Sequence, residues 1–158
     1  MKKLILLAVV AVFAIGSMNA QGNFRAGLNG GIPIGDAGDL ATFAIAIDLG
    51  YILEISDGFD AGVETGYTNY FGKDNFDDFN FIPVNGVANF DLSDDFSAEA
   101  GAGIAFSLET NGGSDFYWKF GFAYDLDEDS DLGLSYRSVS GGNGFSIDGI
   151  FLGYRRSF

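Results

Sequence analysis

Carboxylates are the side chains of this 158-residue chain whose spacing most suggests chemistry, because it has 22 Asp and Glu but no His and no Cys. Without His, the Ser-His arrangement of a membrane phospholipase or a lipid A deacylase cannot form, and without Cys there is no thiol nucleophile. Glu64 and Glu99 are a candidate acid/base pair. Ion-pair networks perturb carboxylates as active sites do, so we favour a structural salt bridge for this pair and expect no enzymatic activity.

The segment from Asp125 to Asp131 carries four aspartates at alternate positions and resembles the opening of a calcium-binding loop. Such a loop also needs Gly at its sixth position and a bidentate Glu at its twelfth. The sequence has Ser130 and Tyr136 there, so we interpret the segment as a solvated turn and expect no metal site. No predicted helix follows the Gly-rich run 100–103, so it forms no phosphate-binding site, and we expect no cofactor.

The composition favours an all-β protein with an acidic surface. The chain has 24 Gly and 17 Phe against 2 Pro; Gly is poor in helices, and aromatic residues favour strands. The formal net charge of −14 argues against nucleic acid as a partner, because affinity for nucleic acid rests on neutralising phosphates. We interpret most acidic residues as solvated turns, although the same surface would also suit divalent cations or cationic partners.

The first 20 residues have the layout of a secretory signal peptide. Lys2 and Lys3 are basic, residues 4–15 are apolar, and residues 17–20 are mostly small or polar. The apolar run is too short to cross a membrane as a helix. We therefore expect a signal peptide at residues 1–20, cleavage after Ala20, and one domain at residues 21–158 whose net charge is −16 after the loss of both lysines.

An internal repeat divides the mature chain into eight segments. Acidic turns begin at Ser56, at Ser93 37 residues later, and at Asp129 36 residues after that, and a strand of small residues follows each. The segments are about ten to fourteen residues long, the length of a tilted strand crossing a bilayer, whereas ordinary globular strands are about half as long. Polar, Gly-rich breaks supply the other four connections: 35–39, 72–78, 109–115 and 140–144.

Most segments alternate apolar with polar or small residues, as in a barrel strand with one face toward lipid. Phe43, Ile45 and Ile47, for example, share one face, and Asp48 lies on the other. An Arg or Lys on the lipid face would cost about 2–4 kcal/mol at the bilayer midplane, so the ionisable residues must point inward.

An eight-stranded barrel is only wide enough for its interior to be filled by side chains, and we expect an ion-paired plug in the lumen. Within it, Arg137 is expected to pair with Glu64 or Glu99. The predicted members of the plug are Arg25, Asp48, Glu54, Glu64, Glu99, Lys119, Asp125, Arg137 and Arg155.

Two segments change the phase of their alternation. In the fourth, Phe79 and Phe81 have one parity and Ile82 has the other, with Pro83 at the change. In the eighth, the change falls around Gly149. Because Pro cannot donate to a ladder and an extra residue shifts the phase, we expect a β-bulge at each position.

These features together resemble the small eight-stranded outer-membrane β-barrels of Gram-negative bacteria, the group that contains the OmpA transmembrane domain and OmpX-like proteins. The resemblance covers residues 21–158 and implies an all-β fold, an eight-stranded antiparallel up-and-down transmembrane β-barrel. It also implies residence in the cell outer membrane, a monomer surrounded by outer-membrane lipid, and insertion by the barrel-assembly machinery.

In that group the last strand carries an assembly signal, made of alternating apolar residues and a C-terminal aromatic residue. The matching residues here are Ile150, Leu152, Tyr154 and Phe158, while Arg156 departs from the pattern by occupying an apolar position. The group also has aromatic residues near its strand ends. The predicted aromatic girdle consists of Phe24, Tyr51, Phe59, Phe90, Phe96, Phe116, Trp118 and Tyr124.

An even number of strands brings both ends of the chain to the periplasmic side. The turns at 56–58, 91–95 and 126–131 are then periplasmic. The outer connections are predicted to be loops at 35–41, 72–78, 109–115 and 139–144, which are short for this group and leave no long adhesive or receptor-binding loop.

We therefore expect an integral outer-membrane barrel with a plugged lumen and a structural or interaction role in the cell envelope. A small or gated channel is one alternative. A secreted soluble β-sandwich or a lipocalin-like binding protein also fits the alternation. Against that class, the five aromatic residues at alternate positions from Phe116 to Tyr124 would be an aggregation hazard on a solvated face.

Overall fold

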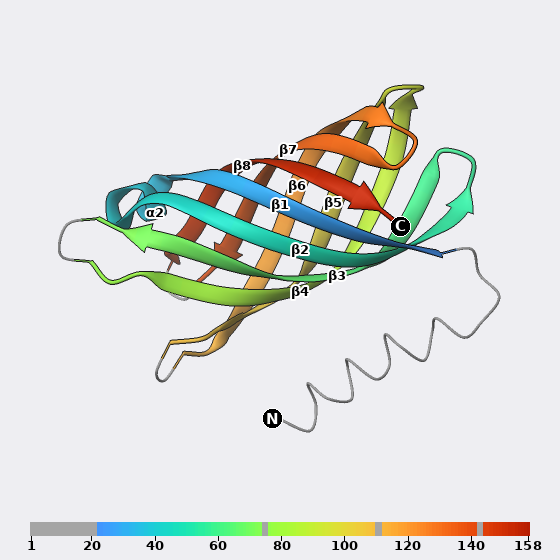
Figure 1. Cartoon of the computed structure of the whole chain (residues 1–158). Helices are drawn as coiled ribbons and strands as arrows, with labels where there is room; N and C mark the ends of the chain where they lie inside the picture. The colour runs from blue at the N-terminus through green and yellow to red at the C-terminus, as the bar shows by residue number, and fades with distance from the viewer. Residues whose placement is uncertain (1–21, 74–75, 110–111, 142–143) are drawn as a thin grey trace.

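The structure, a computed structural model, is a closed barrel of eight antiparallel strands in sequence order, which confirms the predicted fold class (Figure 1). It describes residues 22–73, 76–109, 112–141 and 144–158, so the predicted signal peptide and its cleavage site lie outside the described residues. The strands are β1 (Gly22–Ile34), β2 (Ala41–Ser56), β3 (Phe59–Gly72), β4 (Phe79–Ser93), β5 (Phe96–Ser107), β6 (Ser114–Asp127), β7 (Ser130–Ser140) and β8 (Ser146–Ser157).

The register of the strands sets their tilt. Each strand pairs with its neighbours in sequence, and β1 also pairs with β8, so the sheet has no free edge. Following the paired residues once around the barrel from Gly22 leads back to β1 at Ile32, ten residues further along. With the usual rise per residue and spacing between strands, this stagger tilts the strands by about 40° from the barrel axis.

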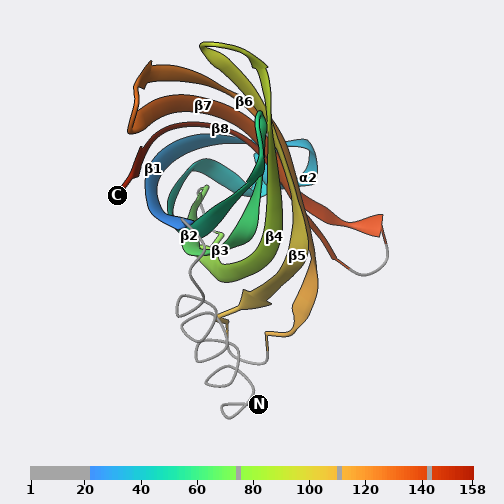
Figure 2. The ribbon, with the colours of Figure 1, turned by 90° about the vertical axis from the view of Figure 1, so that its right-hand side faces the viewer.

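The two ends of the barrel differ in their connections. At the turn end, tight turns at 57–58, 94–95 and 128–129 join β2 to β3, β4 to β5 and β6 to β7, and Gly22 and Phe158 lie at the same end. At the loop end, longer connections join the remaining strands. Figure 2 turns the turn end toward the viewer and shows the strands curving around the lumen.

The segment 35–41, predicted to be a loop, instead contains a short helix, α2 (Gly35–Leu40). Gly35 has φ +57°, a conformation that suits Gly and turns the chain sharply out of β1. Ala37 is completely buried in the core at the loop end, and the helix packs against β8. Sequence reasoning missed α2 because so short a helix shows no apolar periodicity.

Neither predicted β-bulge exists. The register between β4 and β5 is continuous from Phe81 to Asp91, and that between β7 and β8 is continuous across Gly149. The register shifts that do occur lie near the strand ends, between Ala41 and Phe43 and beside the three tight turns.

The phase changes have a different cause, which is that apolar side chains also point into the lumen. Phe81 is buried, and Phe79 and Ile147 pack against the buried core. Pro83 lies within β4, and the Thr65 hydroxyl donates a hydrogen bond of 2.9 Å to its carbonyl oxygen. The assumption that apolar residues face lipid therefore failed where the lumen itself is apolar.

In the central parts of the strands, side chains alternate between the lumen and the outer surface. On β6, Tyr117 and Lys119 are buried, whereas Trp118 and Phe120 are exposed. The same pattern along the other strands gives the barrel an apolar outer band, as the alternation predicts. Among the described residues, no helix is both long and apolar enough to cross a membrane.

Candidate functional site in the lumen

The lumen contains two layers of side chains, and the direction of the strands fixes their order. On β3, β6 and β8 the charged residue lies nearer the turn end and an aromatic residue lies nearer the loop end. The ionic layer consists of Arg25, Asp48, Glu64, Glu99, Lys119, Asp131, Arg137 and Arg155. The aromatic layer consists of Tyr70, Phe81, Tyr117, Val139 and Phe151, with small alanines between them.

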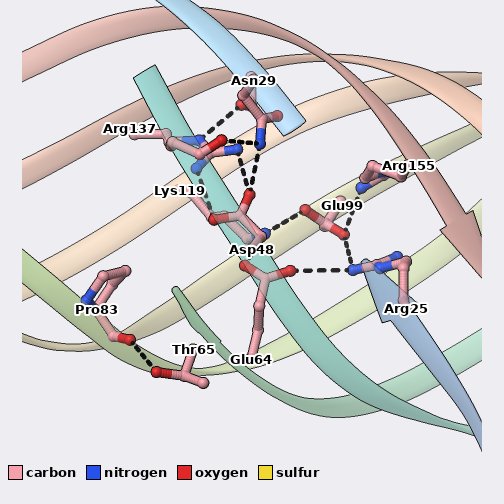
Figure 3. Close-up of polar contacts among 12 residues, drawn as sticks. Arg25, Asn29, Asp48, Glu64, Thr65, Pro83, Glu99, Lys119, Arg137 and Arg155 are labelled. Carbon is pink, nitrogen blue, oxygen red and sulfur yellow. Dashed lines mark hydrogen bonds and ion pairs between the residues drawn. The ribbon is translucent and has the colours of Figure 1, made fainter. Parts of the chain in front are cut away.

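Lys119 lies at the centre of the ionic layer, between two glutamates (Figure 3). Its ammonium is 2.5 Å from Oε1 of Glu64 and 2.6 Å from Oε1 of Glu99. The Lys119 residue is only 3% exposed, so both ion pairs are shielded from water. Because β3, β5 and β6 supply these three side chains, this cluster joins strands that lie across the lumen from one another as well as neighbours.

Glu99 contacts two further cations. Its Oε2 is 2.5 Å from Nη2 of Arg25 and 2.8 Å from Nη1 of Arg155, and Arg25 also lies 3.4 Å from Glu64. The Nε of Arg155 donates to Asp131 at 2.6 Å. Sequence reasoning missed Asp131 because it belongs to the acidic turn segment, although its parity on β7 matches that of Arg137.

Arg137 pairs with Asp48, so the prediction that it pairs with Glu64 or Glu99 is wrong. Its two terminal nitrogens donate to the two carboxylate oxygens at 3.1 and 2.8 Å, a bidentate arrangement. Asn29 donates to the same carboxylate at 2.9 Å, and the Arg137 guanidinium lies 4.8 Å from the centre of the Phe151 ring. The tilt of the strands decides which residues meet across the lumen, and the tilt is not visible in the sequence.

Two residues predicted for the plug lie outside the ionic layer. Glu54 and Asp125 are exposed near the turn end, and neither forms an ion pair within the described part of the chain. Their parity is that of the lumen, as predicted, but they lie close to the turns, where water reaches them. Parity alone therefore did not decide which carboxylates are buried.

The alternating aspartates lie in and beside the turn between β6 and β7. Asp125 and Asp131 face each other across the two strands, and Asp127 accepts hydrogen bonds from the Ser130 hydroxyl at 2.6 Å and the Asp129 N–H at 3.0 Å. These hydrogen bonds lower the pKa of the Asp127 carboxyl. In the described ranges, no group of three or more acidic side chains is arranged to hold a metal ion.

The aromatic layer closes the half of the lumen nearer the loop end. The Tyr70 ring lies 6.0 Å from the Phe81 ring and 6.2 Å from the Phe151 ring, and Phe151 is completely buried. Ala37 of α2 belongs to the same buried cluster. Sequence reasoning missed this layer, although Tyr70, Tyr117 and Phe151 share the parity of the inward charges on their own strands.

Little space is left between these side chains. A cavity of about 10 Å³ lies beside the ion pairs, between residues that include Asp48, Lys119 and Arg155. This volume holds about one water molecule. A cavity of this size is too small for a small-molecule ligand.

The residues of the predicted assembly signal lie on the outer face of β8 or at its end. Ile150, Leu152 and Tyr154 are 44%, 61% and 43% exposed, and Phe158 is 73% exposed. The Phe158 N–H donates to the Phe24 carbonyl oxygen at 2.8 Å, which ties the end of the chain to β1.

The predicted girdle residues divide between the two halves of the barrel. Six of them form pairs across strands near the turn end, with ring centres 4.8 to 5.0 Å apart: Phe24 with Tyr51, Phe59 with Phe90, and Phe96 with Tyr124. Phe116 and Trp118 lie in the half nearer the loop end, where Trp118 packs 5.1 Å from Tyr136.

Comparison with solved structures shows the same fold in small outer-membrane proteins. The attachment invasion locus protein Ail of Yersinia pestis has a TM-score of 0.60 and 16% identity, over 89% of this chain and 100% of that one. For Neisserial surface protein A (NspA) the TM-score is 0.60 and the identity 16%, over 87% and 97% of the two chains. For the N-terminal β-barrel domain of Pseudomonas aeruginosa OprF the values are 0.59 and 16%, over 85% and 99%.

No protein-family model matches the chain, and no curated protein matches it in sequence. At 16% identity, the structural likeness concerns the fold. In strand number, strand order and closure, the chain has the architecture of the small eight-stranded outer-membrane β-barrels that its sequence resembles.

Proposed function

We propose that this protein is an integral outer-membrane barrel with a closed lumen and no catalytic activity, which acts in the cell envelope through its structure or through its surfaces. The apolar outer band and the closed sheet support membrane insertion, because a barrel without edges pairs its backbone groups within the sheet. The predicted signal peptide and the fold shared with outer-membrane proteins support the outer membrane as its location. In this arrangement the turn end faces the periplasm.

The observation that carries the closed lumen is its packing. The cavity beside the ion pairs has a volume of about 10 Å³, too small for a hydrated ion. The purified protein in planar bilayers should therefore give no conductance steps. Heat-modifiable migration on SDS gels, measured on the same preparation, shows that the barrel is folded, and regular steps from folded protein would contradict the proposal.

A small or gated channel is the second candidate, because charged side chains fill half of the lumen. In that case a change in the ion pairs should change conduction. Glu64→Ala leaves Lys119 with Glu99 alone and would open or alter a path if the ion pairs gate one. We expect neither the wild type nor Glu64→Ala to give conductance steps in planar bilayers, because the aromatic layer is intact in both.

A secreted soluble binding protein would separate differently in the cell. The band of aromatic residues from Phe116 to Tyr124 is 36 to 55% exposed and argues against a soluble form. After expression with its own signal peptide in a Gram-negative host, the protein should be found in the outer-membrane fraction. Recovery in the aqueous supernatant would contradict membrane insertion.

Two partners follow from the proposed location. Outer-membrane lipid surrounds a monomeric barrel, and the barrel-assembly machinery recognises the last strand through Ile150, Leu152, Tyr154 and Phe158. Deletion of Phe158 should lower the yield of heat-modifiable barrel while signal-peptide cleavage continues. The control is Phe145→Ala, which removes an aromatic side chain outside the last strand and should leave the yield of barrel unchanged.

A further inference from the structure

An open groove lies at the loop end, between α2 and the pair Gly144 and Phe145. It is a shallow depression, wide open to solvent, with a volume of about 410 Å³. The residues that line it are Asp36, Asp39, Leu40, Gly144 and Phe145. The groove is separate from the lumen, because the buried face of α2 closes the barrel and the opposite face borders the groove.

One wall of the groove is held firmly in place. Ala37 anchors α2 in the core, and the Asp36 carboxylate accepts a hydrogen bond of 3.4 Å from the Ser146 N–H. From the other side, the Lys73 ammonium donates to the Gly38 carbonyl oxygen at 2.5 Å, and the Lys73 N–H donates to the Leu40 carbonyl oxygen at 2.8 Å. These contacts connect α2 to β8 and to the β3–β4 connection, so this wall of the groove is in place before a ligand arrives.

The lining of the groove combines negative charge with apolar surface. Asp36, Asp39 and Leu40 are spaced so that they share one face of α2. Asp36 and Asp39 are exposed, and Phe145 opposite them is 40% exposed. A ligand that matches this surface has a positive charge beside an apolar group.

The charge around the groove also favours a cation. Exposed carboxylates at the loop end include Asp77, Glu109 and Asp115. Lys73 is the one basic side chain in the described loop-end connections, and its ammonium is directed at the Gly38 carbonyl oxygen. A field of one sign raises the local concentration of oppositely charged ligands and speeds their association.

We propose that this groove binds a cationic amphipathic peptide segment, with basic side chains on Asp36 and Asp39 and an apolar side chain between Leu40 and Phe145. The groove thus gives the barrel a ligand-binding function in addition to its closed lumen. The ion pairs are exposed and each contributes little, so we expect weak, salt-sensitive binding.

Fluorescence anisotropy tests the proposal with the purified protein in phosphatidylcholine nanodiscs. The probe is a labelled peptide of alternating Lys and Leu, the counter-probe is one of alternating Glu and Leu, and empty nanodiscs are the blank. The Lys-Leu peptide should bind saturably above the blank and the Glu-Leu peptide should not. Asp36→Asn/Asp39→Asn should weaken binding by about tenfold, and Phe145→Ser should weaken it by about fivefold. Absence of saturable binding would overturn the proposal.

The matched control is Asp77→Asn/Glu109→Gln, which removes the same charge at the same end without touching the lining of the groove. Binding should stay within twofold of wild type in this variant. An equal loss in both double variants would mean that only the general charge attracts the peptide, and this too would overturn the site. Unchanged affinity in Phe145→Ser would exclude the apolar contact and with it an amphipathic ligand. The absence of conductance steps that we expect in planar bilayers does not depend on any of these binding results.

Discussion

Glu99 and Phe151 are both buried in the same lumen, 5% and 0% exposed, yet each needs something different from its surroundings. Glu99 needs charges of the opposite sign, which reach it from β1, β6 and β8. Phe151 needs volume to be filled, which Tyr70 and the other residues of the aromatic layer provide. The first requirement concerns exact partners and the second concerns space.

The contrast extends to the two whole layers. The ionic layer contains four basic and four acidic side chains, so its charge is balanced within the lumen. Buried ion pairs add little net stability over apolar residues of the same size, but an unpaired buried charge is costly. Loss of volume in a packed core is costly in proportion to the cavity that remains. The ionic layer should therefore be sensitive to single changes and tolerant of paired ones, while the aromatic layer should respond to size alone.

The largest effect is expected for Glu99→Gln. The substitution keeps the shape but leaves Lys119, Arg25 and Arg155 with one acid fewer, and we expect a loss of about 3–5 kcal/mol in the free energy of unfolding. Urea titration in lipid vesicles measures it, with the emission of Trp118, the one Trp of the chain, as the signal. Asp125→Asn removes a carboxylate near the turn end as a control and should cost less than about 0.5 kcal/mol. Equal losses in the two variants would contradict a special role of the ionic layer.

A smaller and reversible effect is expected for the pair of Arg137 and Asp48. Arg137→Met alone leaves the Asp48 carboxylate buried beside Asn29, and we expect a loss of about 3 kcal/mol. Asp48→Leu/Arg137→Met removes both charges and should return to within about 1 kcal/mol of wild type. The same urea titration gives all values of the double-mutant cycle. If the double variant is as unstable as the single one, the layers do not differ as we propose.

Phe151→Leu should have a smaller effect still. The change leaves a cavity in the aromatic layer but creates no unpaired charge, and we expect a loss of about 1–2 kcal/mol. The same urea titration measures this loss, and Phe151→Ala, which leaves a larger cavity, should cost more than Phe151→Leu. Equal losses in the two variants would mean that the contact of the ring with Arg137 dominates, because both substitutions remove the ring.

The features that the sequence predicts well are those that follow from the cost of charge in lipid. The eight strands and the inward direction of Arg25, Lys119 and Arg155 follow from strand length and parity alone. This reasoning uses only the position of a residue along its own strand. It therefore succeeds wherever one strand is enough to decide the outcome.

The features that it misses depend on several strands at once. Arg137 meets Asp48 because a stagger of ten residues sets which side chains share a level in the lumen, and nothing in a single segment reveals that stagger. Phe79 and Phe81 point inward because the lumen has an apolar half, which the rule of apolar residues toward lipid cannot anticipate. Helix α2 is defined by one buried alanine and its contacts with β8, both of which are tertiary.

The smallest effect is expected at Asn85, and it is opposite in sign, because a substitution there should increase the stability of the barrel. It lies on β4 at the level of the ionic layer and is 3% exposed, but its Oδ1 and Nδ2 have no hydrogen-bond partner among the described residues. A buried polar group without a partner is destabilising, and an apolar side chain of the same shape removes that cost. Asn85→Leu should therefore raise the free energy of unfolding by about 1 kcal/mol, measured by the same titration. A loss of stability would show that the position needs a polar side chain.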